Sequence, residues 1–467
     1  MGTAAPRLSR IVALAALAAL WGAHQSFAAV DGKQRKAKHD QGLVFVSPSG
    51  SDTALCTKKD PCASWDRAYH LADPGERIEV DGGTYPAQMI TVDPSKVDAP
   101  ADVTFEPYNG KQVEIAGNLV VYGSHIVFDG GKKGFRIRKL ESNAVPGPLT
   151  SNHVAFVNLD GENFNIGPNR YITIQRGDWG PSIACHARGS AYDPSTWCPA
   201  GTPYAKTGND GEVGDWESHI GPDGNIPNQV PENIVLDGLY IHDQNSLDLE
   251  GMHTGGLFLI SGGPITIRNT KFARNVVYDI QIQDFSTPDC CGMKYGAVHD
   301  LTLENNFFGA PVQPLPDNTV NDQQPEVQFD PRNGDIWRNI LIRFNSFDNG
   351  FWWADGSVPV FDNVRVVGNI SDALAYWNGC WYPAAGLSYG SNVWANGGTC
   401  GPTDIAIGAL PYVDASAGSP DFHLTGGPAQ DLVTPTTGDY ALTTDIDGDP
   451  RPIGPASDAG ADERTKR

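Results

Sequence analysis

The chain has 467 residues, among them 53 Gly and 35 Pro, and a formal net charge of −22 at pH 7. Nucleic acid and anionic membrane surfaces repel so acidic a protein, which excludes both as expected partners. The Gly and Pro content predicts a turn-rich β protein rather than a helical one. An acidic polysaccharide is not excluded, because bound cations or a local basic groove can bridge the repulsion.

The first 28 residues read as a secretory signal peptide. Arg7 and Arg10 precede an apolar run from Ile11 to Leu20, and a small-x-small cleavage pattern ends at Ala28. The apolar run is too short to span a bilayer. We therefore expect a secreted, extracellular chain without membrane insertion, with a flexible lead-in over residues 29–42.

The eight cysteines of an exported protein should be mostly paired. No CxxC motif is accompanied by a second one, so a cysteine metal site is not expected. Adjacent Cys290 and Cys291 either bridge each other or pair elsewhere. Sequence proximity suggests three further bridges, Cys56–Cys62, Cys185–Cys198 and Cys380–Cys400.

The main body opens with strand-like Val44–Val46 and a turn-like segment, Ser47–Asp52. A short helix is expected over residues 64–72 with Ser64 as its N-cap. Two further segments follow, Pro74–Val80 and Gly82–Tyr85, which read as strands separated by a glycine turn.

One short phrase then recurs along the chain. It consists of an apolar-x-apolar pair followed by Asn or Gly close to a second apolar residue. From the second copy on, its starts are 31, 36, 39 and 24 residues apart, the period of a stacked array whose loops vary in length. The copies begin at Ile126, Ile234, Ile265, Leu301, Ile340 and Val364.

The phrase predicts a parallel β-solenoid built as one long body. Strict alternation gives each strand one buried and one exposed face, and Asn or Gly after the strand provides the left-handed backbone of a sharp turn. Stacked coils then bury a continuous apolar column that no single coil can bury. We expect Ile267, Leu303 and Ile342 to point into this column.

The opening segments resemble the N-terminal cap of secreted proteins of the pectate-lyase-like superfamily. The C-terminal segments Ser419–Leu424, Thr444–Pro452 and Asp458–Glu463 resemble the tail that such proteins often carry. The resemblance implies an all-β, right-handed parallel β-helix over residues 43–463, with a short N-terminal capping helix. It implies no single activity, because this fold hosts lyases, hydrolases, epimerases and non-catalytic proteins.

Residues 177–232 interrupt the repeat and are rich in Gly, Pro, Asn and Asp. So long an irregular segment in a compact protein is usually functional or disordered. With several aromatic residues and the expected Cys185–Cys198 bridge, we predict an ordered loop insertion lying over one face of the solenoid. The alternative is an insertion without a role.

A second series of strands lies between the copies of the phrase, and its alternation predicts an outward polar strip. Equivalent side chains of neighbouring rungs stack about 4.8 Å apart. Amides and carboxylates hydrogen-bond sugar hydroxyls, and aromatic faces stack on pyranose rings, so this strip is the first candidate site. Its carboxylates are Asp279, Glu326 and Asp330, and its expected substrate-binding residues are Gln281, Gln283, Gln328, Trp352 and Trp353.

Two mechanisms fit such a strip. In a lyase, Ca²⁺ held by the carboxylates neutralises a uronate, and Arg332 or Lys294 removes the proton next to it. In an inverting glycoside hydrolase, two carboxylates act as acid and base, roughly 6.5–9.5 Å apart. The alternative is that outward Asp, Glu and Gln side chains are ordinary solvated residues.

A second candidate is the pair His242-Asp243 with His253. Two histidines near an acid can move protons or ligate a metal. The preferred interpretation is nevertheless a turn histidine bonded to a neighbouring loop. The motif order of polygalacturonases and the Asp-His signature of pectate lyases proper are absent, so neither activity is carried over by residue.

We therefore predict a secreted, monomeric, polysaccharide-active protein, in the first place a lyase of uronate-containing glycans with a possible Ca²⁺ requirement. The alternatives are an inverting glycoside hydrolase and a non-catalytic carbohydrate-binding or structural β-helix protein.

Overall fold

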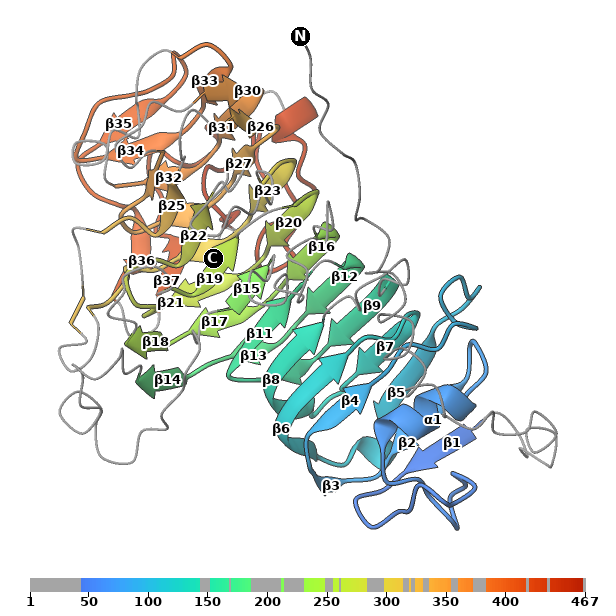
Figure 1. The fold of residues 1–467 in the computed structure, drawn as a ribbon. Helices are drawn as coiled ribbons and strands as arrows, with labels where there is room; N and C mark the ends of the chain where they lie inside the picture. Colours follow the sequence, from blue (N-terminus) through green and yellow to red (C-terminus); the bar gives the residue numbers. More distant parts are fainter. Residues whose placement is uncertain are drawn as a thin grey trace, which may run out of the picture. The chain divides into compact units, whose positions relative to one another are not determined.

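The recurring phrase forms the strands of one long parallel sheet in the computed structural model (Figure 1). The register places Ile234 beside Ile265 and Ile265 beside Leu301, and further along it places Leu303 beside Ile342. Each coil thus lays equivalent residues on those of the coil before. The predicted all-β parallel β-helix is confirmed, and a right-handed coil is the hand that parallel crossover connections take.

The predicted signal peptide and lead-in lie outside the described residues and stay predictions, whereas Leu43–Arg467 form one compact unit. The structure describes residues 43–142, 152–167, 169–185, 211–213, 231–247, 255–259, 262–283, 298–313, 319–320, 324–330, 336–353, 360–372, 384–416, 420–434 and 437–464.

The first side of the coil is a 12-stranded parallel sheet. Residues that follow its strands have the left-handed backbone that the sequence predicts, with φ of 52° at Asn269 and 53° at Asn305. The turn that leaves each strand is therefore encoded locally. In pairing order the strands are β1 (Leu43–Val46), β2 (Arg77–Val80), β5 (Val103–Pro107), β7 (Ile126–Asp129), β9 (Asn152–Val157), β12 (Arg170–Gln175), β16 (Glu232–Asp237), β20 (Ile265–Arg268), β23 (Leu301–Glu304), β27 (Leu341–Arg343), β31 (Val364–Val367) and β33 (Leu387–Gly390).

The second side is an 11-stranded parallel sheet that contains the predicted polar strip. Two of its strands lie off the main path, where β10 pairs with β8 and β4 pairs with β6. Its strands are β3 (Gly83–Tyr85), β4 (Gln88–Ile90), β6 (Val113–Val121), β8 (Phe135–Ser142), β10 (Leu159–Asp160), β11 (Asn163–Ile166), β15 (Gly211–Val213), β19 (Leu257–Leu259), β22 (Ile280–Gln283), β25 (Val327–Asp330) and β29 (Phe351–Trp352).

The third side is an 8-stranded parallel sheet of short strands that begins later in the chain. Each strand follows a strand of the first sheet after a brief turn. The strands are β13 (Asp178–Trp179), β17 (Tyr240–His242), β21 (Lys271–Ala273), β24 (Phe307–Phe308), β28 (Ser346–Phe347), β32 (Ile370–Ser371), β34 (Val393–Ala395) and β35 (Ile405–Ile407).

Smaller elements complete the described structure. One helix, α1 (Trp65–Leu71), is capped by Ser64, whose hydroxyl accepts the Arg67 backbone N–H at 3.2 Å, as the sequence predicts. The remaining elements are the pairs β14 (Ser182–Cys185) with β18 (Gln244–Leu247), β26 (Ile336–Arg338) with β30 (Val360–Asp362), the antiparallel β36 (Tyr412–Asp414) with β37 (Asp421–Leu424), and the 3-10 turns Tyr108–Gly110 and Gly438–Tyr440.

Columns of apolar side chains fill the coil. Ile267, Leu303 and Ile342 are fully buried, so their predicted inward orientation is confirmed. At the N-terminal end, Trp65 of α1 stacks on Phe105 with 5.2 Å between ring centroids. The helix therefore contributes its largest side chain to the column and covers the first coils.

A ladder of buried amides forms the turn between the first and third sheets. Asn345 Oδ1 accepts the backbone N–H of Asn306 at 3.1 Å, and the Asn345 N–H donates to Asn369 Oδ1 at 2.9 Å. The Asn345 amide also donates to the Leu303 carbonyl at 2.9 Å. The ladder begins at Thr270, whose N–H donates to Asn306 Oδ1, so it fixes the start of β21.

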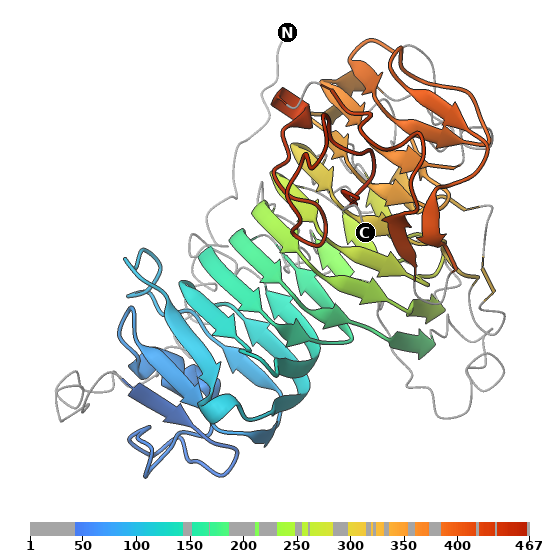
Figure 2. The same cartoon turned by 180° about the vertical axis from the view of Figure 1, so that it is seen from behind.

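The C-terminal segment folds back over the third sheet, and Figure 2 shows it in dark red across the yellow and orange rungs. Its Ala461 N–H donates to Ser346 Oγ at 3.0 Å. A second apolar cluster joins it to the outer face of β24, β32 and β34. Arg451 and Glu463, both fully buried, form an ion pair of 3.2 Å inside the segment.

Parts of the predicted loop insertion belong to the coil. Within residues 177–232, β13 pairs with β17, and β15 pairs with both β11 and β19. The prediction of a loop insertion over 177–232 is therefore wrong for these strands, because so short a rung strand needs only two or three residues, such as Asp178–Trp179 and Gly211–Val213.

One predicted disulfide, Cys56–Cys62, is present, and Cys400 is also disulfide-bonded. Cys198, Cys290, Cys291 and Cys380 lie outside the described residues, so the other predicted bridges stay predictions.

None of the helices in the described part of the chain has the length and apolar character that crossing a bilayer requires.

Candidate functional site

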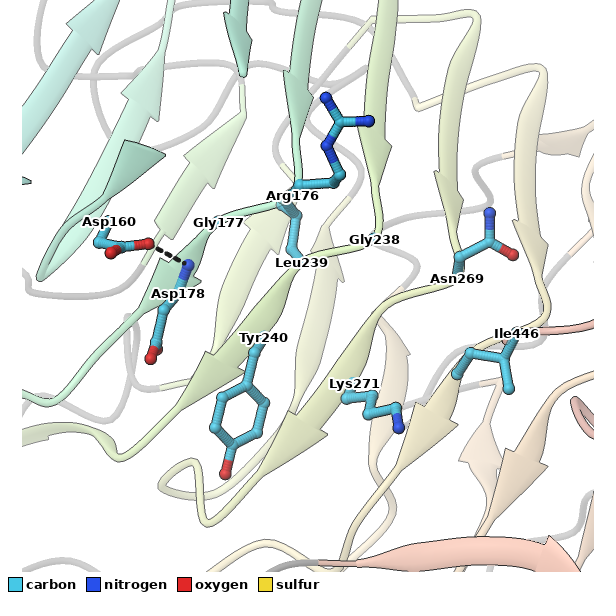
Figure 3. Close-up of a pocket in the computed structure, with 10 residues that line it drawn as sticks. All are labelled: Asp160, Arg176, Gly177, Asp178, Gly238, Leu239, Tyr240, Asn269, Lys271 and Ile446. Carbon is cyan, nitrogen blue, oxygen red and sulfur yellow. Dashed lines mark hydrogen bonds between the residues drawn. The ribbon is translucent and has the colours of Figure 1, made fainter. Parts of the chain in front are cut away.

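A groove of about 420 Å³ lies where three successive coils turn from the first sheet into the third (Figure 3). Most of its lining residues precede or begin the strands β13, β17 and β21, so the same turn recurs three times along the floor, and Asp160 of β10 comes from the coil before them. One further residue comes from the C-terminal segment. The lining consists of Asp160, Arg176, Gly177, Asp178, Gly238, Leu239, Tyr240, Asn269, Lys271 and Ile446.

The register of the third sheet orders the groove. Asp178 pairs with Tyr240, and Tyr240 pairs with Lys271. These residues stack at about 4.8 Å per rung, with their side chains on the outer face. Their neighbours Trp179 and Phe272 point inward and are fully buried. An acid, an aromatic ring and an amine therefore follow one another along the groove.

His242 continues this surface along β17. Its ring stacks on Tyr240 with 4.3 Å between centroids. Its Nε2 lies 2.8 Å from Asp178 Oδ1, and its Nδ1 lies 2.8 Å from Asp243 Oδ2. Arg274 donates its Nε–H to the other Asp243 oxygen at 2.8 Å. One imidazole thus bridges two carboxylates from neighbouring coils, which only a doubly protonated ring does with both N–H groups.

The surroundings shift the proton affinities of these groups. Burial alone would lower the pKa of His242, but its hydrogen bonds to Asp243 and Asp178 raise it above the ordinary value. Burial, with the charges of Asp243 and Asp178, raises the pKa of the Tyr240 hydroxyl. Burial, reinforced by the Asp178 charge, also raises the pKa of the Asp160 carboxyl. The groove therefore favours protonated forms of three groups that can transfer protons.

Two cations in the groove form no ion pair within 4.0 Å with a carboxylate of the described residues. The Arg176 Nε–H donates to Asn158 Oδ1 at 3.1 Å, which leaves its terminal nitrogens without a partner among these residues. The Lys271 ammonium lies 5.0 Å from the centroid of the Phe307 ring and acts on the Asp421 carboxyl only at longer range. In so acidic a chain, two such cations in one groove favour an anionic ligand.

The predicted polar strip stacks in register but does not form an open surface. Gln281 pairs with Gln328, and Gln328 pairs with Trp352. Gln281 is 7 % exposed and Gln328 3 % exposed. The prediction that these amides face solvent is wrong, because alternation identifies the side of a strand that points away from the core and not whether other residues cover it. Gln283 pairs with Asp330, whose side chain is half-buried.

Asp279 and Glu326 are fully buried, so the prediction that they point outward is also wrong. Both precede their strands, where regular alternation does not apply. Glu326 accepts the backbone N–H groups of Asn349, at 2.7 Å, and Gly350. Burial raises the pKa of both carboxyls well above the ordinary value, and Asn275 donates to Asp279 Oδ1 at 2.9 Å. Their assignment as Ca²⁺ ligands together with Asp330 stays a prediction.

The two tryptophans of the predicted strip have different environments. Trp353 is fully buried, packs against Phe329 at 4.4 Å between centroids and donates its indole N–H to Tyr389 at 2.9 Å. It belongs to the core, so its prediction as a substrate-binding residue is wrong. Trp352 is half-buried and keeps its outward position in the ladder.

The structure places one predicted catalytic residue, His242, beside the groove, in contact with its lining residues Tyr240 and Asp178. Arg332, Lys294 and His253 lie outside the described residues, and their roles stay predictions.

The sequence reasoning missed the other residues of the groove, Asp160, Arg176, Asp178, Tyr240 and Lys271. A sequence signal was present for two of the three strands, because β17 and β21 each follow the left-handed turn after a copy of the phrase. The strand β13 follows Arg176, which has the same left-handed backbone but stands after no copy of the phrase that the sequence analysis identified.

Comparisons with known proteins give distant structural similarity only. No family model matches the chain, and no curated protein matches it. The pectate lyase Pel9A superposes with a TM-score of 0.45 at 13 % identity, covering 92 % of this chain and 98 % of its own. A rhamnogalacturonan lyase gives a TM-score of 0.38 at 12 % identity, with 80 % and 91 % covered. The catalytic domain of a GH87 α-1,3-glucanase in complex with tetrasaccharides gives 0.33 at 14 %, with 79 % and 69 % covered.

Proposed function

We propose that this chain binds an acidic polysaccharide in the groove of β13, β17 and β21 and cleaves it there by β-elimination. The observation that carries the proposal is the pair of cations, Arg176 and Lys271, that form no close ion pair with a described carboxylate and lie beside the Tyr240 ring. Uronate carboxylates and pyranose faces are the complementary partners of such a surface.

Each step of an elimination has a group in the groove. Pairing of a uronate carboxylate with Arg176 or Lys271 stabilises the negative charge that develops when the neighbouring C–H proton leaves. His242 in its neutral form accepts that proton. The electron pair then forms the C=C bond and expels the glycosidic oxygen, which takes a proton from the Tyr240 hydroxyl.

The raised pKa of His242 sets the pH dependence of this mechanism. The imidazole is a base only after it loses a proton, and its hydrogen bonds to Asp243 and Asp178 delay that loss beyond its ordinary pKa of about 6.5. Cleavage should therefore rise with pH through the His242 pKa. Asp178, whose side chain is 57 % exposed, can swing away from Nε2 when substrate enters.

A second candidate, glycoside hydrolysis, is favoured by the pair Asp160 and Asp178. A bridge between Gly161 and Trp179 sets them on neighbouring rungs, about 4.8 Å apart along the coil. This is close to the carboxylate spacing of retaining enzymes, about 5–5.5 Å, and shorter than that of inverting ones. A hydrolase at this groove would thus be retaining, with Asp160, the acid of raised pKa, as proton donor.

A panel of acidic and neutral polysaccharides distinguishes the candidates, with and without a chelator to test the predicted Ca²⁺. Absorbance of unsaturated uronate indicates elimination, and new reducing ends without that absorbance indicate hydrolysis. Binding without either product supports the non-catalytic alternative.

The double variant Arg176→Ala/Lys271→Ala tests the groove itself. Loss of two charge-assisted contacts should weaken binding of an acidic polysaccharide by roughly 10- to 100-fold. A matched variant, Arg338→Ala/Lys59→Ala, removes the same charges elsewhere and should bind like the wild type. Equal binding by both double variants would contradict the proposal.

A further inference from the structure

A second cluster of polar side chains lies in the C-terminal segment. His423 of β37, Asp447 of the turn after Thr444 and Asp462 near the end of the segment each offer one nitrogen or oxygen, and these atoms lie within 4.8 Å of one another. The three residues are 24 and 15 positions apart in sequence, so the fold and not a local turn brings them together.

The hydrogen bonds of His423 leave one nitrogen facing the carboxylates. Its Nδ1 is bound to the Asp421 carboxylate, and its Nε2 lies 2.5 Å from Asp447 Oδ2. An imidazole between two carboxylates carries a proton on each nitrogen, so an ion bound at Nε2 takes the place of the proton that now points at Asp447. The Asp421 carboxylate on Nδ1 orients the ring, as in histidines that ligate metals.

Asp462 is the most constrained member of the cluster. It is 7 % exposed, and its Oδ2 accepts the Leu424 N–H at 2.8 Å. The positive charges that act on this carboxyl are those of His423 and Arg451, and Arg451 is already paired with Glu463. A divalent ion at the cluster would therefore neutralise a nearly buried carboxylate together with Asp447.

We propose that His423, Asp447 and Asp462 bind a divalent transition-metal ion such as Zn²⁺, with Asp421 orienting the imidazole. One imidazole nitrogen and two carboxylate oxygens are a usual Zn²⁺ ligand set, and a water molecule completes the tetrahedron. Ligand atoms about 2.0–2.1 Å from one ion lie roughly 3.3 Å from each other. The half-exposed side chains of His423 and Asp447 reach this geometry by small rotations, while Asp462 stays fixed by Leu424.

Bound there, the ion ties β37, the turn around Asp447 and the last turn of the chain to one point. These are the parts of the C-terminal segment that cover the third sheet. The site therefore holds that cover in place, and the proposal does not rest on the activity proposed for the groove.

Zn²⁺ titration of the full chain, stripped with a chelator, tests the site by calorimetry and thermal unfolding. Co²⁺ gives a second readout, because a tetrahedral site with nitrogen and oxygen ligands produces visible absorption. The wild type should bind at this site and melt at a higher temperature with Zn²⁺. His423→Gln and Asp447→Asn should each lose one bound equivalent and the thermal shift, and Asp421→Asn should bind about 10- to 100-fold more weakly.

His299→Gln is the matched control. Its Nδ1 lies 2.6 Å from Asp300 Oδ2, the same His–Asp arrangement, with no second carboxylate on it among the described residues. This variant should keep the wild-type stoichiometry. The proposal is overturned if the wild type binds no Zn²⁺, or if His423→Gln and Asp447→Asn bind it with wild-type stoichiometry and affinity.

Discussion

The outer face of the third sheet has two halves, of which one is open and the other is covered. Over β13, β17 and β21 the outward residues Asp178, Tyr240 and Lys271 line an open groove. From β24 onward the outward positions Phe307, Ile370 and Val393 are apolar, with Ser346 between the first two, and the C-terminal segment covers them. The column of equivalent positions is continuous across the boundary, where Lys271 pairs with Phe307. A β-helix can thus cover one half of a face and leave the other half open by changing the outward residue of each coil.

The boundary itself is formed by residues that belong to both halves. Ile446 of the C-terminal segment lines the end of the groove, and its N–H donates to the Ala461 carbonyl at 3.0 Å. Loosening the cover should therefore also open the groove at this end. Substitutions in the two halves should separate into those that unfold the protein and those that change only binding.

The largest expected effect is at the buried ion pair of the cover. Arg451→Met leaves Glu463 buried without its cation and removes the Arg451 hydrogen bonds to the Asp458 and Gly460 carbonyls. Breaking one partner of a buried pair costs about 3–5 kcal/mol. Chemical denaturation should report this loss, and limited proteolysis should release the C-terminal segment first.

Arg268→Ala is the matched control for that variant. Arg268 is 43 % exposed and pairs with Asp237 at 3.0 Å, and such surface pairs contribute about 0–1 kcal/mol. Equal losses of stability in both arginine variants would show that the cover is not held by the buried pair.

The next effect compares the two halves directly. Phe307→Ala removes a fully buried ring that contacts Phe422 and should cost about 3 kcal/mol in the free energy of unfolding. Tyr240→Ala removes an equivalent outward ring from the open half and should change it by less than about 1 kcal/mol. Denaturant midpoints of the two variants measure the difference, and similar midpoints would remove the distinction between the halves.

Much of the architecture follows from local sequence, as the left-handed turn residues Asn269 and Asn305 illustrate. Each repeats the same strand and turn chemistry, so the stacked sheet and the inward Leu303 are predictable without knowledge of distant contacts. The site is less predictable, because it depends on register between coils. Asp178 and His242 are 64 residues apart, and only the lengths of the intervening rungs bring them to 2.8 Å.

The wrong prediction that the polar strip faces solvent has a related physical cause. Alternation at Gln281 and Gln328 identifies their side of the sheet correctly, yet coverage by other chain segments is a tertiary property that period-2 patterning does not contain. Glu326 fails for a different reason, since it stands before its strand and turns to cap the N–H groups of Asn349 and Gly350. Where two backbone N–H groups lie within reach of a carboxylate, hydrogen bonds to them determine the direction of the side chain instead of the alternation of the strand.

A smaller effect concerns stability at acid pH. We expect it to depend partly on Asp93, which belongs to neither half. Burial alone would raise the pKa of Asp93, but hydrogen bonds from Lys96 and Ser95 bring it to about 2, below its ordinary 3.8. The stabilisation, about 2 kcal/mol, is complete above pH 3.8 and is lost as pH falls through the folded pKa.

The double variant Asp93→Asn/Lys96→Met removes both charges of this 2.5 Å pair. Its free energy of unfolding, followed from pH 5 to 2, should fall less steeply than that of the wild type. The groove variant Tyr240→Ala should keep the wild-type slope. If the free energy of unfolding falls equally steeply in the wild type and the double variant, this pair does not determine the loss of stability at acid pH.

The smallest effect on stability is expected at His242. A variant at this position distinguishes a catalytic role of the open half from a purely structural one. His242→Gln removes two hydrogen bonds, but Asp178 is largely exposed to water and Asp243 keeps its Arg274 partner, so unfolding should change by less than about 1 kcal/mol. The same variant should lose cleavage of an acidic polysaccharide while retaining its binding, because a proton acceptor acts mainly in the transition state. A denaturation midpoint lowered as far as that of Phe307→Ala would instead make the imidazole a structural tie between coils. In that case His242 serves to hold neighbouring coils together, and a polysaccharide bound by Arg176 and Lys271 would have no proton acceptor for its cleavage.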